Sequence, residues 1–196
     1  MQGEPIESVK SGLHALTSSL RQDPYALETV HLSVMTFDQD VKVLTPLTPL
    51  EQFQVPEIVL PRSGPTHLGL ALERLLEEMD RTVRKTTEEA RGDWRPMLFV
   101  MTDGAVSDLM AYEEILPAVK ARGFATIIAC AAGPKARRDQ LELLTDKVVT
   151  LETMDSAGFS ALFKWVSASI SAGSGSAGGA LDLPPPPPEI GGSPVL

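Results

Sequence analysis

Short apolar runs alternate along the chain with segments whose apolar residues recur at helical spacing, and this alternation restricts the fold more than any other feature. Residues 97–101 form a continuous apolar run between Pro96 and a Thr-Asp-Gly turn, which is typical of a strand buried on both faces. The helical segments between successive runs are long enough for crossover connections. We therefore predict an α/β fold with a doubly wound, mostly parallel sheet and helices on both faces.

The other elements follow from the same two periodicities. Helices are predicted at 5–21, from 66 toward the charged stretch before Gly92, and at 112–122, 138–144 and 160–170. Strands are predicted at 27–37, 41–46, 97–101, 125–131 and 148–151. The turn Asp38-Gln39-Asp40 makes the first two strands an antiparallel hairpin, which we place at the edge of the sheet.

The composition divides the chain into a domain and a tail. A length of 196 residues with 43% hydrophobic residues suits one domain with a real core, which we assign to residues 1–172. Residues 173–196 are rich in Gly and Ser and then contain five prolines at 184–188, which predicts a flexible spacer and a polyproline II segment. We expect a disordered tail; the alternative is a proline-rich ligand for an aromatic groove.

The charge and the single cysteine limit the partners and the compartment. A formal net charge of −9 repels a phosphate backbone, so nucleic acid is not expected as a partner. No run reaches the roughly 18 apolar residues that span a bilayer, and no basic and apolar leader opens the chain. Cys130 lies inside an apolar run, which favours a buried thiol over a disulfide or a nucleophile. We therefore expect a cytoplasmic protein without membrane association.

Two polar loops lie where the binding sites of doubly wound folds are found. In such folds ligands bind beyond the carboxyl ends of the strands. Asp103 follows the most apolar strand, and Gly104 lets the backbone turn sharply after it. Thr66 opens the long helix after the loop at 63–65, where backbone N–H groups point outward.

Several motifs, taken in order, make the sequence resemble a known family. They are Gly3-Glu4-Pro5-Ile6 at the start of the first helix, Leu32-Ser33-Val34-Met35-Thr36-Phe37-Asp38, Pro46-Leu47-Thr48, Ser63-Gly64-Pro65-Thr66-His67-Leu68-Gly69, Trp94-Arg95-Pro96 and Met101-Thr102-Asp103-Gly104. In order and spacing, over residues 1 to about 170, they resemble a von Willebrand factor type A domain, and most of all the bacterial tellurite-resistance TerY-like group.

The resemblance implies a metal-ion-dependent adhesion site. In this family three loops hold a divalent cation, and a carboxylate of the partner fills an open coordination position. Thr66 matches the threonine of the second loop and Asp103 the aspartate of the third. Mg²⁺ is the expected cation, because it prefers hydroxyl, carboxylate and water oxygens. As rim residues we place Ser63, Gly64, Gly104, Ser107 and Asp108.

The sequence departs from the family at the first loop of that site. There the family has an Asp-x-Ser-x-Ser motif that ends the first strand and supplies most of the ligands, and Met1 falls where this motif has just finished. We therefore expect an incomplete metal site and a sheet without its central strand. Either the natural protein starts upstream of Met1, or the sheet closes differently, through pairing of the strands at Leu32 and Phe99 or through a strand from a partner chain.

No signature of catalysis accompanies these loops. The sequence has no Gly-x-x-x-x-Gly-Lys-[Ser/Thr] loop, no Gly-x-Ser-x-Gly elbow and no Gly-x-Gly-x-x-Gly after a strand, and His14, His31 and His67 lie in separate elements. We expect a non-catalytic interaction module that binds an acidic residue of a protein partner. The alternative is a metal- or nucleotide-dependent α/β enzyme that uses Asp103. The TerY-like resemblance implies a stress-response role beside kinase- or phosphatase-like partners.

Overall fold

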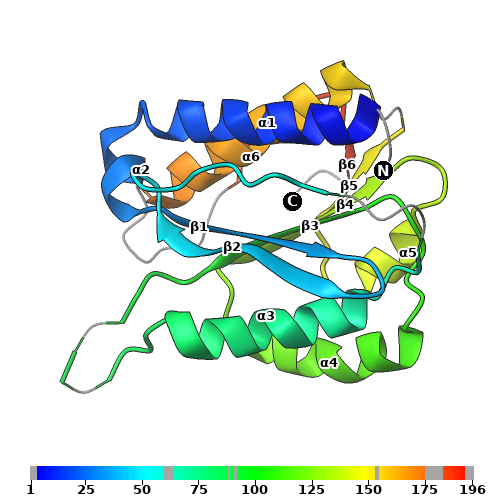
Figure 1. Ribbon diagram of the computed structural model, residues 1–196, viewed down its shortest axis with the longest axis horizontal. Coiled ribbons are helices and arrows are strands. Elements are labelled where there is room, and N and C mark those ends of the chain that lie inside the picture. The colour runs from blue at the N-terminus through cyan, green and yellow to red at the C-terminus, as the bar shows by residue number, and fades with distance from the viewer. Residues whose placement is uncertain are drawn as a thin grey trace.

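The computed structural model describes residues 4–59, 64–87, 89–90, 92–152, 155–174 and 183–192. Its strands form a central layer between two layers of helices (Figure 1). Helices α1 (Glu4–Leu20) and α6 (Ser156–Ser174) cover one face, and α3 (Leu68–Thr82) and α4 (Leu109–Ala121) cover the other. The predicted α/β fold with helices on both faces is confirmed.

The larger sheet carries the parallel strands. Strands β3 (Met97–Thr102), β4 (Thr126–Ala132) and β5 (Val148–Leu151) run parallel to one another, and β6 (Gly191–Gly192) adds to β5 in the antiparallel direction. Strand β4 lies between β3 and β5 and is buried at every position except Ile127, which agrees with its continuous apolar sequence.

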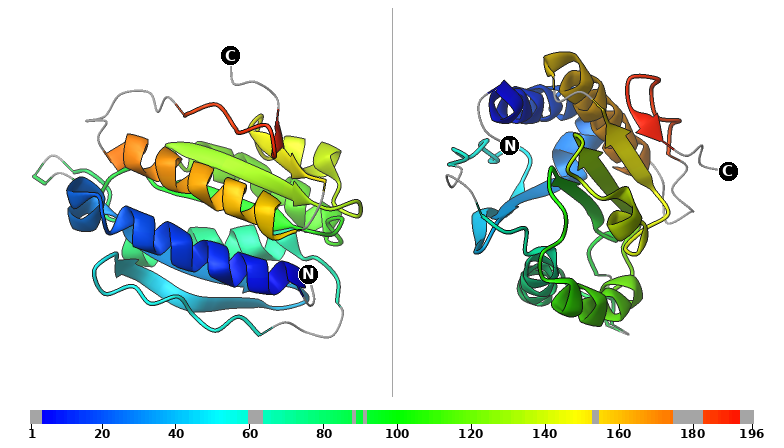
Figure 2. Two further views of the ribbon diagram at one scale, coloured as in Figure 1. Left: turned by 90° about the horizontal axis from the view of Figure 1, so that it is seen from above. Right: turned by 90° about the vertical axis from the view of Figure 1, so that its right-hand side faces the viewer.

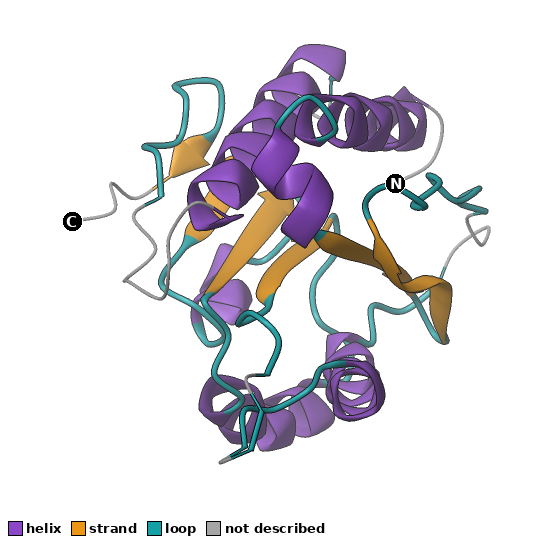
Figure 3. Cartoon of the chain, turned by 90° about the vertical axis from the view of Figure 1, so that its left-hand side faces the viewer, coloured by secondary structure: helices purple, strands orange, loops and turns teal. Residues whose placement is uncertain are grey.

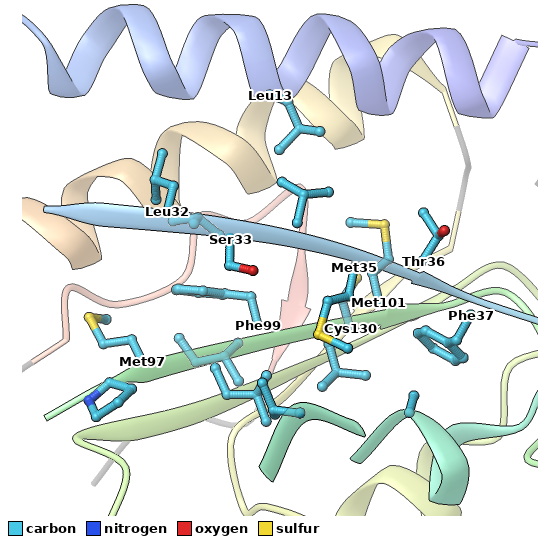
Figure 4. Close-up of a pocket in the computed structure, with 18 of the residues that line it drawn as sticks. Leu13, Leu32, Ser33, Met35, Thr36, Phe37, Met97, Phe99, Met101 and Cys130 are labelled. Atoms are coloured by element: carbon cyan, nitrogen blue, oxygen red, sulfur yellow. The ribbon is translucent and has the colours of Figure 1, made fainter. Parts of the chain in front are cut away.

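Strands β1 (His31–Phe37) and β2 (Val41–Pro49) form a separate antiparallel hairpin. In the described chain β1 pairs with β2 alone and β3 with β4 alone, so no ladder joins the two sheets (Figure 3). Direct pairing of the strands at Leu32 and Phe99, one of the alternatives that the sequence left open, is therefore not formed (Figure 4). Each strand instead docks on the helices, since Leu32 and Phe99 both pack against the core that α1 and α6 form.

Helix α2 (Pro24–Thr29) occupies residues that the sequence analysis assigned in part to a strand. The Asp23 carboxylate accepts hydrogen bonds from the backbone N–H groups of Tyr25 and Ala26, at 3.0 and 3.4 Å. This cap and the proline in the first turn start a helix, and the strand begins only at His31.

Helix α3 ends at Thr82, earlier than predicted. Two residues later, Arg84 is hydrogen-bonded to Asp93 and no longer follows the helix. The Arg84 backbone N–H donates to Asp93 Oδ2 at 2.8 Å, and the Arg84 guanidinium pairs with Asp93 Oδ1 at 3.1 Å. The backbone hydrogen bond from Arg84 and its guanidinium hold the pKa of Asp93 below its usual value. The short helix α5 (Arg138–Glu142) precedes β5.

Part of the C-terminal tail is folded against the domain, contrary to the expected disorder of residues 173–196. Helix α6 continues to Ser174, and the segment 183–192 returns along it and ends in β6 (Figure 2). The Trp165 indole N–H donates to the Pro184 carbonyl oxygen at 2.7 Å, and the side chains of Leu183 and Ile190 are buried. The prediction is wrong for 183–192, because the composition of a segment does not show which apolar surface can hold it.

Candidate functional site

The loops that carry Thr66 and Asp103 meet at the carboxyl ends of β1 and β3. Thr66 lies just before α3, and Asp103 and Gly104 directly follow β3. A Cβ atom on Gly104 would stand 2.8 Å from Thr66 Oγ1, so any larger residue at this position would displace the threonine hydroxyl. The structure therefore places the hydroxyl of one loop against the backbone of the other, at the edge where ligands bind in this fold class.

Ser107 ties these two loops together. Its hydroxyl accepts a hydrogen bond from the Thr66 backbone N–H at 3.0 Å, and its own backbone N–H donates to the Thr66 carbonyl oxygen at 2.9 Å. Within the Asp103 loop, the Gly104 backbone N–H donates to Thr102 Oγ1 at 3.2 Å. Ser107 and Thr102 thus hold the two loops in shape, and the placement of Ser107 at the rim of a metal site stays a prediction.

Asp108 connects the same region to the start of α3. Its carboxylate accepts hydrogen bonds from the backbone N–H groups of Gly69 and Leu70, at 3.2 and 2.9 Å. These are N–H groups of the first turn, which have no partner inside the helix. Asp108 therefore caps α3 from another part of the chain, a role that the sequence analysis did not assign to it.

The turn between β1 and β2 also belongs to this edge. The His67 backbone N–H donates to the Asp38 carbonyl oxygen at 2.9 Å, and the His67 ring lies 3.2 Å from the Gln39 carbonyl oxygen. A Cβ atom on Gly64 would lie 3.9 Å from Asp38 Cβ. Asp38 directly follows β1, and this position in the sequence points to the same edge of the sheet, although turn chemistry explains an aspartate there equally well.

Thr66 and Asp103 bring two oxygen donors to the same edge of the sheet. Thr66 and Asp103 offer hydroxyl and carboxylate oxygens, which are the ligands of a hard divalent cation, and both are half-buried. Over the described ranges, no three His, Cys, Asp or Glu side chains lie close enough together to hold a metal ion. Ser63, which we predicted at the rim, lies outside the described residues. The donor chemistry fits, but the cation needs further oxygens from water or from another molecule.

Exposed apolar side chains stand beside these loops. Leu70 on α3 and Leu109 and Met110 on α4 are 40%, 42% and 87% exposed. They occupy the first turns of two helices that Asp108 joins. We call these three residues the apolar rim. An apolar group next to polar loops is the usual composition of a protein-binding surface.

The other reactive side chains lie elsewhere. Cys130 is 4% exposed in β4, and burial raises the pKa of its thiol to about 12, so it stays protonated near neutral pH. Its expected burial is confirmed. His14 lies on α1 and His31 at the opposite end of β1 from Asp38. The Tyr112 hydroxyl is buried, which raises its pKa, and it donates to the Gln140 carbonyl oxygen at 2.9 Å.

A parallel sheet between two helical layers, with hydroxyl and carboxylate oxygens at its carboxyl edge, defines a class of α/β binding domains. The family model of the von Willebrand factor type A domain matches residues 1–159, and the chain belongs to this family. Domains of this family are typically interaction modules without enzymatic activity.

Solved structures show the same fold. Proximal thread matrix protein 1 from the mussel byssus, in a form described as having a zinc-occupied MIDAS motif, is 20% identical, with a TM-score of 0.60 over 86% of this chain and 43% of that one. A von Willebrand factor type A protein from Catenulispora acidiphila is 12% identical, with a TM-score of 0.55 over 83% of this chain and 39% of that one. The chain therefore spans less than half of the length of either protein.

No curated protein matches the chain. Among the helices of the described residues, none has the length and the apolar content needed to cross a membrane.

Proposed function

We propose that this domain is a non-catalytic interaction module that binds an acidic side chain of a protein partner through a divalent cation. Thr66 and Asp103 are two of the ligands of that cation. The observation that carries this proposal is the close approach of their two loops, where Gly104 leaves room for Thr66 Oγ1 and Ser107 bonds to both sides of Thr66.

Mg²⁺ is the cation that this donor set favours. Mg²⁺ usually keeps several waters in proteins and binds through one or two carboxylates. Asp103 supplies one carboxylate and Thr66 a hydroxyl, so an acidic side chain of the partner adds the second carboxylate. Because the described residues give an incomplete site, affinity for the cation alone is weak, and partner and cation bind better together than either does separately.

The apolar rim supplies the rest of the contact. Leu70, Leu109 and Met110 lie next to the loops that carry the two donors, and Met110 is 87% exposed. A partner that places an acidic residue at the cation then covers these apolar side chains. The apolar rim contributes most of the binding energy and orients the partner, because a single weakly held cation is too small a contact to do either.

The cellular setting follows from the resemblance to the TerY-like group. We place the domain in the cytoplasm of a bacterium, in a stress response of the tellurite-resistance type, with kinase- or phosphatase-like proteins as partners. The motifs around Thr66 and Asp103 support this assignment. The net charge of −9 is consistent with a protein rather than a nucleic acid as the partner.

Binding of Mn²⁺, a spectroscopic substitute for Mg²⁺, tests the site. The chain is expected to bind Mn²⁺ with a dissociation constant in the range of about 10⁻⁴–10⁻³ M, as for cation sites with few charged ligands. Asp103→Asn removes the only charged ligand and is expected to weaken binding about tenfold or more. The electron paramagnetic resonance signal of free Mn²⁺ measures both values.

Asp80→Asn is the matched control for Asp103→Asn. Asp80 is an exposed carboxylate that pairs with Arg122 near the C-terminal end of α3, whereas the Thr66 loop lies at the N-terminal end of this helix. Its loss is expected to leave the affinity for Mn²⁺ unchanged. Equal affinities of the Asp103→Asn variant and the original chain contradict the proposed site.

A further inference from the structure

The segment 183–192 is held on the domain at both ends of its proline run. The side chains of Leu183 and Ile190 are 6% and 2% exposed and belong to the core that α1 and α6 form. Between them the Trp165 indole N–H donates to the Pro184 carbonyl oxygen at 2.7 Å, and directly after them β6 pairs with β5. The prolines between the two buried side chains are therefore fixed on the surface of the domain.

The proline run has the backbone of a polyproline II helix. A proline ring fixes φ at about −65°, and a proline also excludes the α region for the residue before it. Residues 184–187 meet both conditions, and the structure shows neither α-helix nor strand there. The Ile190 backbone N–H donates to the Pro187 carbonyl oxygen at 3.0 Å, and this turn ends the extended run.

The three ridges of this helix differ in exposure. A polyproline II helix has three residues per turn, so residues three apart lie on one ridge. Pro185 and Pro188 are both exposed. Pro184 and Pro187 are both half-buried, and Leu183 on the third ridge is buried. Pro185 and Pro188 therefore stand out from the domain, and we call these two residues the proline ridge.

An exposed proline ridge suits an aromatic-lined groove of another protein. Such grooves recognise prolines spaced three apart, and a stiff polyproline II segment loses little conformational entropy when it binds. Attachment of the segment at both ends lowers this cost further. Figure 2 shows the segment beside α6 and β5, on the side of the sheet opposite the hairpin of β1 and β2.

The charge beside the proline ridge indicates what borders the groove. Glu189 is exposed and directly follows Pro188. The chain as a whole carries a formal net charge of −9. Both charges attract a groove that has Lys or Arg at its border and repel a groove that has Asp or Glu there.

We propose that the proline ridge is a second protein-binding site, which inserts into an aromatic-lined groove of a partner domain with basic residues at its border. The partner binds the segment while it is docked on α6, so Pro185 and Pro188 make the contact. No cation takes part in this contact. Binding at the proline ridge therefore persists in EDTA, unlike binding through a cation at Thr66 and Asp103.

Purified WW, SH3 and EVH1 domains, which bind proline-rich segments, are the probes. Each is labelled with fluorescein and titrated with the full chain in EDTA. Saturable one-to-one binding of at least one probe, measured by fluorescence anisotropy, is expected. The double variant Pro185→Ala, Pro188→Ala is expected to weaken this binding at least about tenfold. Glu189→Lys is expected to weaken it as well, because the new charge repels the basic border.

The double variant Pro184→Ala, Pro187→Ala is the matched control. It removes the same number of prolines at the same spacing, and both backbone carbonyl oxygens remain to accept from Trp165 and Ile190. Binding is expected to change by less than about threefold. Absence of binding by every probe overturns the proposal. Equal weakening by the two double variants also overturns it, because a segment released from α6 presents both pairs of prolines alike.

Discussion

Replacing Gly69 by alanine is expected to destabilise the domain by about 1–3 kcal/mol, although the same change in an ordinary helix stabilises it by about 0.5–1 kcal/mol. Gly69 lies in the first turn of α3, where α3 touches α4. A Cβ atom there would stand 2.5 Å from the Tyr112 backbone nitrogen and 2.8 Å from the Ala111 carbonyl carbon. Both are backbone atoms of α4, which cannot move without moving the helix. The sign of the effect therefore distinguishes close helix packing from simple helix propensity.

Urea unfolding of Gly69→Ala, followed by far-UV circular dichroism, measures the effect. Gly64→Ala is the control, because among the described residues its new Cβ atom meets only Asp38 Cβ, at 3.9 Å. The control is expected to change the free energy of unfolding by less than about 1 kcal/mol. A Gly69→Ala variant that is more stable than the original chain contradicts the contact between α3 and α4.

Replacing Trp165 by alanine is expected to cost about 3–5 kcal/mol of stability, the largest single effect that we predict. Trp165 is 6% exposed in α6, and its indole N–H donates to the Pro184 carbonyl oxygen at 2.7 Å. The substitution removes a large buried side chain and also the hydrogen bond that attaches the segment 183–192. This segment is then expected to leave the domain and to become sensitive to proteolysis.

Two other substitutions separate the parts of this effect. Trp165→Phe keeps much of the packing and removes the hydrogen bond, for an expected loss of about 1 kcal/mol. Trp94→Ala changes a tryptophan that is 48% exposed and is expected to cost much less than Trp165→Ala. Similar losses for Trp94→Ala and Trp165→Ala, with an unchanged rate of proteolysis at 183–192, contradict the docking of this segment.

The elements that the sequence predicts well are those whose pattern is local. The apolar run 97–101 is the strand β3, and the turn 38–40 joins two antiparallel strands. The predicted boundaries of helices and strands are wrong where hydrogen bonds to a single side chain determine the conformation of the backbone. Asp23 caps a helix inside the predicted strand at 27–37, and Asp93 binds the backbone that follows Thr82.

Longer-range contacts are not visible in a local pattern. Asp108 caps α3 at Gly69, which lies 39 positions earlier in the chain. The Trp165 indole N–H holds the proline-rich segment at the Pro184 carbonyl oxygen. A segment whose composition is typical of disorder is therefore ordered in the fold. The same limit applies to the candidate site. The end of a strand indicated Asp103 and the start of a helix indicated Thr66, but only the folded chain shows that Ser107 bonds to Thr66.

The most direct test of the cation bridge compares two peptides that differ in one side chain. Each is fluorescein-labelled and carries Leu and Gly residues around a single central residue, Glu in one peptide and Gln in the other. With Mg²⁺ present, the Glu peptide is expected to bind the chain at least about tenfold more tightly than the Gln peptide, and EDTA or Asp103→Asn removes this preference. Equal binding of the two peptides with Mg²⁺, or a preference for Glu that persists in EDTA, contradicts a partner carboxylate bound through a cation at Thr66 and Asp103.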